Sequence, residues 1–357
     1  MLGKQTIRDI KFKNQIVLVR VDYNVPIENQ QIIDDFRIRA SLPTLKYLLK
    51  NGARKLILIS HLGRPAGRKN PALSLRPVAV RLQALLPNQT VQFVDDVSGP
   101  EVESAVRKLP KNGILLLENL RFYAEEEQNS SDFAAEIVES THAQLFVQDG
   151  FAVVHRAHSS TTAITELLPS VAGLLLEQEI TVLSQVLDHP KRPLVVMIGG
   201  AKVDDKQGLI AKFAPLADHL IVAGKIAADG YQADFPNVYV AEDFITDSAG
   251  QPRDIGPKSI AHIQNILSAA HTVIWNGPLG QVEQPEFAKS SISIAQALSS
   301  LQNTTTLICG GDTTAFIQNL QTTHPELKFT LISTGGGAAL EFLSGLPLPG
   351  LDSLEDK

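Results

Sequence analysis

Short apolar runs recur along this chain of 357 residues, and most are followed by a segment with the spacing of an amphipathic helix. Several runs are apolar on successive residues, which is typical of strands covered on both faces. Strands are predicted at Ile16–Val21, Lys55–Ser60, Gly113–Leu117, Leu145–Val147, Leu194–Ile198, His219–Val222, Asn237–Val240, Thr272–Trp275, Thr306–Ile308 and Phe329–Ile332. Helices are predicted at Arg39–Lys50, Leu75–Leu86, Asp132–Ser140, Lys258–Ala269 and Phe287–Leu301. This alternation predicts an α/β fold in which helices cover both faces of parallel sheets.

The length of the chain favours two domains, each large enough to bury its own core. A long helical pattern at Val171–Leu187 lies between the two halves, and the prolines Pro190 and Pro193 stop it. We therefore expect an N-terminal domain over residues 1–170 and a C-terminal domain over residues 171–342, which includes a connecting helix at 171–188.

Composition and charge narrow the class of protein. The chain is 44% hydrophobic and 20% charged, as in ordinary soluble proteins, and its net charge of −6 argues against a nucleic-acid binder. No apolar run is long enough to span a membrane, and the first residues lack the apolar core of a secretion signal. The single cysteine, Cys309, fits a reducing compartment and continues an apolar strand, so we expect a packed thiol in a cytoplasmic protein.

Polar and cationic side chains follow each predicted strand of the first half. Any one of them could be a turn residue or a solvated cation, but the carboxyl ends of parallel strands lie at one edge of a sheet. Arg37 also lies in the first turn of a helix, where the helix dipole disfavours a cation, so this side chain is either solvated or held there for a ligand. Together these residues predict a pocket for a small phosphate or carboxylate: Asp22, Asn24, Arg37, His61, Arg64, Arg121, His155 and Arg156.

Glycine-rich turns follow the strands of the second half. The segments are Gly199–Lys206, which carries Lys202 and Lys206, and Trp275–Gly280, Cys309–Thr314 and Ser333–Ala338. Backbone N–H groups at such turns bind phosphates, and Asp312 among them could hold Mg²⁺. Glu283 could accept hydrogen bonds from a ribose, although an exposed glutamate needs no ligand. The first segment lacks the P-loop pattern, so taken alone it also fits a plain turn with two solvated lysines.

Nine segments, in order and across nearly the whole chain, resemble phosphoglycerate kinase. They are Val19–Pro26, Ser60–Pro65, Glu118–Phe122, His155–Ser159, Gly199–Lys206, Asp254–Lys258, Trp275–Gly280, Gly310–Thr313 and Ser333–Ala338. The resemblance implies two Rossmann-like three-layer α/β/α domains that face a cleft and are joined by a hinge helix. It also implies transfer of the acyl phosphate of 1,3-bisphosphoglycerate to Mg-ADP by a monomer, giving 3-phosphoglycerate and ATP.

The resemblance also implies a set of site residues. Phosphoglycerate would be bound by Asp22, Tyr23, Asn24, Arg37, His61, Leu62, Gly63, Arg64, Arg121 and Arg156. The nucleotide would be bound by Gly200, Ala201, Lys206, Gly256, Asn276, Glu283, Gly310, Gly311, Asp312 and Thr313, with Asp312 on the metal. Arg37, Lys202, Gly335 and Gly336 would act on the transferring phosphoryl group. The tail, residues 343–357, would return to the N-terminal domain.

The chain departs from the family pattern in three places. Ala223-Gly224-Lys225 stands where the family has three glycines. The stretch from Lys225 to Tyr239 is shorter than its counterpart in the family, and the residues around Asp149 differ from the family sequence. Three other hypotheses therefore stay open. The chain could be a catalytically weak relative that binds phosphoglycerate or a partner, or a kinase for another acyl phosphate. Alternatively, within an active kinase, Lys225 could pair with a nucleotide phosphate.

Overall fold

The computed structural model describes residues 3–200 and 204–357, which divide into two compact units. Unit 1 contains the residues up to Thr181 together with Pro347–Lys357, and unit 2 contains Val182–Leu346. The boundary falls inside helix α6 (Leu174–Asp188) rather than at residue 170, so the first turns of this helix belong to unit 1.

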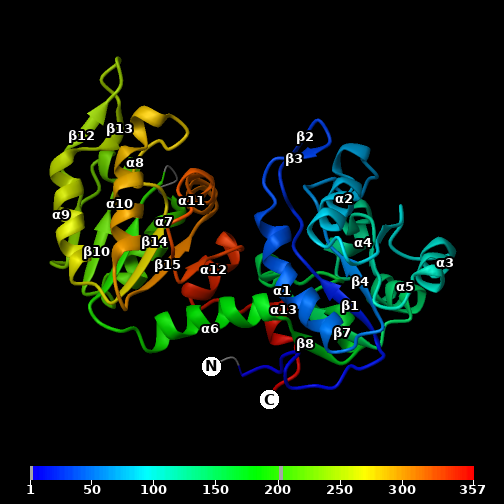
Figure 1. The fold of residues 1–357 in the computed structure, drawn as a ribbon. Helices are drawn as coiled ribbons and strands as arrows, with labels where there is room; N and C mark the ends of the chain where they lie inside the picture. The colour runs from blue at the N-terminus through cyan, green and yellow to red at the C-terminus, as the bar shows by residue number, and fades with distance from the viewer. Residues whose placement is uncertain (1–2, 201–203) are drawn as a thin grey trace. The chain divides into compact units, whose positions relative to one another are not determined.

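Unit 1 is built on a parallel sheet with the strand order β5-β6-β4-β1-β7-β8 (Figure 1). Its strands are β1 (Ile16–Arg20), β4 (Lys55–Ile59), β5 (Val91–Phe93), β6 (Ile114–Leu116), β7 (Leu145–Gln148) and β8 (Ser170–Ala172). Its helices are α1 (Phe36–Lys50), α2 (Arg76–Leu85), α3 (Pro100–Lys108), α4 (Ala124–Glu127), α5 (Ser131–Thr141) and the short α13 (Pro349–Asp352). A small hairpin joins β2 (Ile27–Glu28) to β3 (Gln31–Ile32).

Both faces of this sheet are buried because the side chains of each strand alternate between two cores. In β1, Val17 and Val19 pack in one core with residues of α1 and α2. Leu18 points to the other face and packs with residues of α3 and α5. This arrangement gives three layers and explains why the strands are apolar on successive residues.

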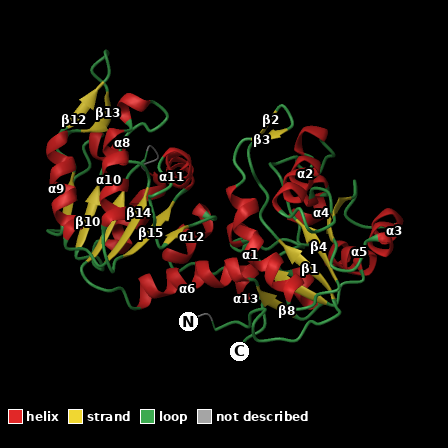
Figure 2. Cartoon of the chain, in the orientation of Figure 1, coloured by secondary structure: helices red, strands yellow, loops and turns green. Residues whose placement is uncertain are grey.

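Unit 2 repeats the architecture of a parallel sheet covered by helices (Figure 2). Its strand order is β11-β10-β9-β14-β15-β16. Its strands are β9 (Leu194–Ile198), β10 (His219–Val222), β11 (Val238–Val240), β14 (Thr272–Asn276), β15 (Thr305–Cys309) and β16 (Leu331–Ile332). Its helices are α7 (Asp204–Phe213), α8 (Gly224–Ala228), α9 (Pro257–Ser268), α10 (Lys289–Ser300), α11 (Gly311–Thr323) and α12 (Gly336–Leu343). An antiparallel hairpin joins β12 (Phe244–Thr246) to β13 (Pro252–Ile255).

The α/β class with parallel sheets is confirmed, and each predicted strand and helix is present with small shifts at its ends. The predicted start of the connecting helix at residue 171 is wrong, because β8 includes Val171 and Ala172 and pairs with β7. The helix begins at Leu174, after Gly173. The edge strand β5 was not predicted either; it has three residues, of which the middle one, Gln92, is polar.

The C-terminal tail packs on unit 1. Residue Lys4 forms an isolated antiparallel bridge with Asp356, and the amide of Gly350 donates to the carbonyl of Val154 at 2.8 Å. Among the described residues, no helix combines the length and the apolar character that crossing a membrane requires.

Candidate active site

The carboxyl ends of β1, β4, β6 and β7 lie side by side in the sheet of unit 1, and the predicted anion-binding residues follow them. Asp22 and Asn24 follow β1, His61 and Arg64 follow β4, Arg121 follows β6, and Arg156 comes after β7. The sheet therefore brings to one edge residues that are up to 134 positions apart, from Asp22 to Arg156.

Hydrogen bonds fix the loops after β1 and β4 against each other. The guanidinium of Arg37, on the first turn of α1, contacts the Asp22 carboxylate at 2.8 Å and donates to the carbonyl of Asn24 at 3.0 Å. The Asn24 side chain accepts from the amide of Gly63 at 2.9 Å. Asp22 thus holds the cation that the helix dipole disfavours, and about a third of the Arg37 side chain (30%) remains exposed.

The loop after β6 is tied to the loop after β4. The Arg121 side chain, only 5% exposed, donates to the carbonyl of Gly63 at 2.9 Å and pairs with Glu127 at 3.1 Å. Asn119 is fully buried and donates to the Leu62 carbonyl at 2.7 Å while accepting from the Leu62 amide at 3.1 Å. Asn119 was not predicted as a site residue, although an asparagine directly after a buried strand is a signal for such a role.

The arginines of these loops surround His61, and burial together with their charges lowers its pKa. Burial is the main reason that this pKa lies well below its usual range, and the charges of Arg20, Arg121, Arg37 and Arg156 lower it further. His61 is 4% exposed, so it stays neutral in the middle of a group of guanidinium charges. Arg64 is exposed and lowers the pKa of Arg121, which places it beside the same group.

Two residues predicted to bind phosphoglycerate have buried side chains. The Tyr23 ring lies in the core, with its hydroxyl 2.9 Å from Ser41 Oγ, and burial raises its pKa. Leu62 is 4% exposed. Their side chains cannot meet a polar ligand there, so any contact from these two positions comes from the backbone.

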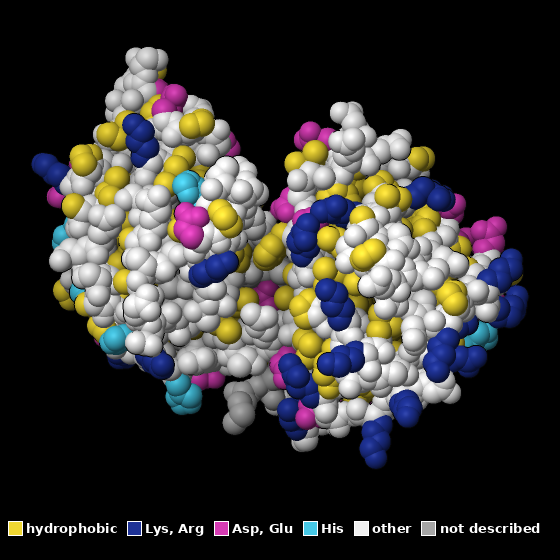
Figure 3. All heavy atoms as spheres, in the orientation of Figure 1, with side chains coloured by type: hydrophobic (Ala, Val, Ile, Leu, Met, Phe, Trp, Pro, Cys, Tyr) yellow, Lys and Arg dark blue, Asp and Glu magenta, His cyan; other side chains and the backbone are white. Residues whose placement is uncertain are grey.

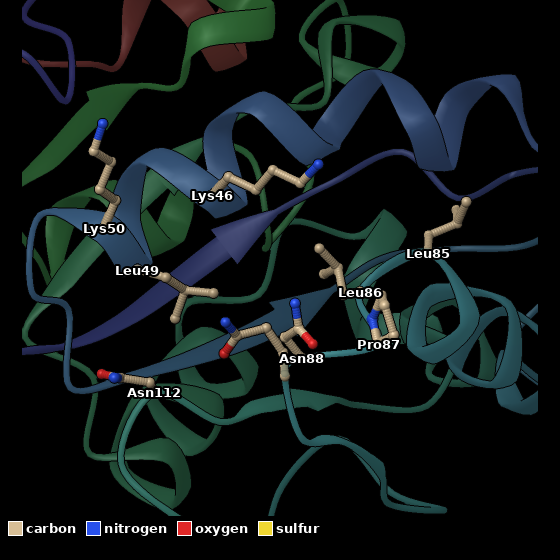
Figure 4. Close-up of a pocket in the computed structure, with 9 residues that line it drawn as sticks. Lys46, Leu49, Lys50, Leu85, Leu86, Pro87, Asn88 and Asn112 are labelled. Carbon is tan, nitrogen blue, oxygen red and sulfur yellow. The ribbon is translucent and has the colours of Figure 1, made fainter.

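Surface charge alone does not mark this site. Lys and Arg side chains are spread over the face of unit 1 seen in Figure 3. Another cavity, of about 370 Å³, is lined by Lys46, Lys50, Leu85 and Asn112 among others (Figure 4). Its residues come from the ends of α1 and α2 and from the turn before β6, at the amino ends of the strands. Ligand sites of parallel sheets lie at the opposite edge.

In unit 2 the chain reverses direction along the sheet between β9 and β14, and close-packed glycines follow both strands. A Cβ atom on Gly277, whose φ is +95°, would lie 2.1 Å from the carbonyl oxygen of Gly199. A Cβ atom on Gly199 would lie 2.4 Å from the carbonyl oxygen of Pro278. Only glycine fits this approach of two backbones, which lies where doubly wound sheets bind their ligands.

A cavity of about 460 Å³ lies at this edge of unit 2. Three of the predicted nucleotide residues line it, namely Gly200, Glu283 and Asp312. The rest of its wall comes from α8, the β12–β13 hairpin and the turn after β14, and these residues were not predicted to bind nucleotide. They are Gly224, Lys225, Ala228, Asp229, Phe244, Gln251, Pro252, Arg253, Asp254, Pro278, Leu279, Gly280 and Gln281.

Hydrogen bonds link other predicted residues at the carboxyl ends of β14 and β15. Lys206 Nζ donates to the Asn276 side-chain oxygen, and Asn276 Nδ2 lies 3.4 Å from the sulfur of Cys309, which is buried as expected. The Thr313 hydroxyl accepts from the amide of Gly277 at 2.7 Å. Lys206 is thus held against the side chain of Asn276 at the end of β14.

The glycine turns at α11 and α12 pack on each other. A Cβ atom on Gly336 would lie 2.8 Å from the amide nitrogen of Gly311, and Gly310 has a φ of +89°. Gly335 is the N-cap residue of α12. The first turns of two helices therefore lie together, and such turns offer amide donors to anions.

Three of the predicted positions are not part of this arrangement. Ala201 and Lys202 lie outside the described residues. Gly256 is the N-cap of α9, where a Cβ atom would lie 2.2 Å from the Asp243 carboxylate. It does not line the cavity, so its glycine is explained by packing.

Comparison with known proteins gives one consistent result. The sequence profile of the phosphoglycerate kinase family matches residues 7–238 and 226–346, two segments that overlap at the shortened stretch after Lys225. Phosphoglycerate kinases from Dictyoglomus turgidum and Pelotomaculum thermopropionicum are 39% and 40% identical, and each alignment covers 100% of both chains. The structure also resembles phosphoglycerate kinase from Pyrococcus horikoshii (TM-score 0.86, 26% identity) and from Coxiella burnetii (TM-score 0.79, 29% identity), each with 98% of both chains covered.

Proposed function

Since the chain belongs to the phosphoglycerate kinase family, we propose that the arginine site of unit 1 binds phosphoglycerate and that the cavity of unit 2 binds the nucleotide. The chain is an enzyme that transfers the acyl phosphate of 1,3-bisphosphoglycerate to ADP, giving 3-phosphoglycerate and ATP, in a reversible reaction. The hypothesis of a catalytically weak relative is not favoured, because the similarity to phosphoglycerate kinases extends over the whole chain.

The convergence of four arginines on His61 carries the assignment for unit 1. Guanidinium groups bind phosphate and carboxylate oxygens with paired hydrogen bonds, and phosphoglycerate carries one group of each kind. Neutral His61 adds a donor or acceptor without a charge. The amides of Tyr23, Leu62 and Gly63 donate to Ser60, Asn119 and Asn24, so these three positions contribute by fixing the loops that carry the arginines.

The strand order of unit 2 supports an orientation for the nucleotide. Asp312 and the first turn of α11 follow β15, whereas Lys225 and α8 follow β10, three strand spacings away in the sheet. That distance is about 14 Å, which suits an extended nucleoside diphosphate. The phosphates would then lie at the turns with Gly310 and Gly311, the ribose near Glu283 and the base near α8.

Mg²⁺ fits the donors of this cavity. Asp312 is an exposed carboxylate on the wall of the cavity, and Mg²⁺ bound to nucleotides uses one or two carboxylates together with phosphate oxygens and water. The described residues contain no cluster of three or more His, Cys, Asp or Glu side chains that could hold a metal alone. When bound at Asp312, the ion would neutralise charge on the phosphate oxygens.

Phosphoryl transfer needs positioning and charge stabilisation more than covalent chemistry by the protein. We assign Arg37 and Lys202 to the equatorial oxygens of the migrating group, and the amides near Gly335 and Gly336 to additional hydrogen bonds. No general base is required, because the accepting phosphate oxygen of ADP is already an anion. The site has to exclude water during transfer, since the acyl phosphate is otherwise lost to hydrolysis.

Two arginines on α1 offer a matched test. Arg37→Ala removes a donor at the site and is expected to lower kcat about 100-fold or more with a smaller change in KM. Arg39→Ala is the control: this side chain is 54% exposed and pairs with Asp35 at 2.8 Å, so kcat should stay within about twofold. Equal rates in the two variants would remove Arg37 from the chemistry.

We also propose that the enzyme works as a monomer in the cytoplasm, as the family resemblance and the single buried cysteine favour. Light scattering coupled to size-exclusion chromatography would give the mass in solution. A dimer at working concentration would contradict this part of the proposal.

A further inference from the structure

An arginine lies beneath the phosphoglycerate site, in a place where it cannot reach a ligand. Arg20 is the last residue of β1 and is 1% exposed. Its guanidinium donates to Ser160 Oγ at 2.9 Å and to the carbonyl of Val21 at 2.5 Å, and its Nη2 lies 3.1 Å from Nδ1 of His61. A cation at the end of an otherwise apolar strand is costly unless each of its donors is used.

A carboxylate compensates this buried charge through one intermediate residue. Glu126 on α4 is fully buried, and it accepts from Ser160 Oγ at 2.6 Å and from the Ser160 amide at 3.0 Å. The Ser160 hydroxyl therefore accepts from Arg20 and donates to Glu126. The result is a continuous chain of hydrogen bonds from Glu126 to His61.

The contact between Arg20 and His61 determines which nitrogen of the histidine carries the proton. Arginine has donors only, so Nδ1 of His61 must be the acceptor in this contact. The neutral ring then carries its proton on Nε2, the nitrogen that Arg20 does not contact. We propose that Arg20 is a positioning residue that fixes His61 as a neutral Nε2–H donor for the substrate.

The charges around His61 also favour the neutral ring, because in addition to burial they lower its pKa. The guanidinium groups that face it come from β1 (Arg20), α1 (Arg37), the loop after β6 (Arg121) and the segment after β7 (Arg156). Two carboxylates balance part of this charge: Asp22 pairs with Arg37, and Glu126 accepts from Ser160 and lies 3.9 Å from Nδ1 of His158. Protonation of His61 would break the bond from Arg20 and place two cations face to face.

This inference rests on the proposed function only in assigning the Nε2–H donor to the substrate. The tautomer can be measured in the protein without ligand, so its failure is distinguishable from a failure of phosphoglycerate to bind at this site. Long-range ¹H–¹⁵N spectra of the histidines, assigned with His61→Gln, report which nitrogen carries the proton. In the wild-type enzyme His61 should show a single Nε2–H tautomer that does not titrate between about pH 5.5 and about pH 8.5.

A double substitution is used to remove the buried charges of Arg20 and Glu126 together, because replacing Arg20 alone would leave the Glu126 carboxylate without a compensating cation. In Arg20→Met/Glu126→Gln, His61 should lose the fixed tautomer. The ratio of variant to wild-type KM for 3-phosphoglycerate should then change about threefold or more between about pH 6 and about pH 8. Ionisation of the substrate affects both enzymes equally, so it does not alter this ratio. Arg20→Lys, which keeps the charge, should restore part of the wild-type behaviour.

Three outcomes would overturn the proposal. The first is an Nδ1–H tautomer of His61 in the wild-type enzyme, and the second is titration of wild-type His61 near its ordinary pKa. The third is a folded double variant that keeps both the wild-type tautomer and a KM ratio independent of pH. If the double variant does not fold, the wild-type spectrum and Arg20→Lys decide the question.

Discussion

Replacing Asp149 with asparagine should make unit 1 more stable at alkaline pH and have a smaller effect at acid pH. Asp149 follows β7 and is fully buried. Its Oδ1 accepts from the Thr44 hydroxyl at 2.9 Å and from the Leu175 amide in the first turn of α6 at 3.0 Å. Burial raises the pKa of this carboxyl from 3.8 to about 7 despite these hydrogen bonds.

The sign and size of the effect follow from this pKa. The folded state binds the proton more tightly than the unfolded state, so the stabilisation is complete below the unfolded pKa of 3.8. It is lost as the pH rises through the folded pKa of about 7. The complete loss is about 4 kcal/mol, and roughly 2.5 kcal/mol of it falls between about pH 5 and about pH 8.

Asparagine keeps the accepting oxygen and cannot ionise. The free energy of unfolding of Asp149→Asn, minus that of the parent, should therefore rise by roughly 2.5 kcal/mol from about pH 5 to about pH 8. Urea unfolding followed by circular dichroism measures this difference. Fluorescence of Trp275, the only tryptophan of the chain, follows unit 2 as an internal control that should not respond to the substitution. A difference that is constant with pH would refute the reasoning.

Three further substitutions test unit 2. Gly277→Ala should destabilise this unit by about 3 kcal/mol or more, because the new Cβ would lie 2.1 Å from a backbone oxygen at a φ of +95°; an unchanged urea midpoint would contradict the packing. Lys225→Ala should change the KM for ADP less than about threefold, since the Lys225 ammonium is exposed and pairs with Asp229 at 2.6 Å. A larger increase in this KM would support the hypothesis that Lys225 binds a nucleotide phosphate. Asp312→Ala should raise the Mg²⁺ concentration for half-maximal rate about tenfold, and an unchanged requirement would exclude Asp312 as the metal ligand.

The sequence predicted the parts of the fold that have a strong local signal. Apolar strands such as Leu194–Ile198 and amphipathic helices such as α9 are visible as runs and periods. The strand Ser170–Ala172 is not visible in this way, because it continues into an apolar helix and its extended state depends on pairing with β7. The strand order also depends on contacts between distant segments, which one sequence does not contain.

The candidate site was predictable at positions where an unexpected residue type follows a strand. Asp312, after β15, is of this kind, and Arg37 was recognisable as a cation in the first turn of a helix. Tyr23 lies in such a loop as well, but its ring turns into the core to meet Ser41, and this orientation depends on the packing of α1. The supporting network from Glu126 to His61 joins residues from four separate segments, so only the folded chain reveals it.

Hydrogen exchange of the full-length enzyme with each ligand alone tests the central claim most directly. We predict that 3-phosphoglycerate slows exchange in the loops that contain Asn24, Gly63, Arg121 and Arg156. ADP with Mg²⁺ should slow exchange at the turns around Gly310 and in α8. Protection by 3-phosphoglycerate confined to unit 2, or by ADP confined to unit 1, would contradict the assignment of the two ligands.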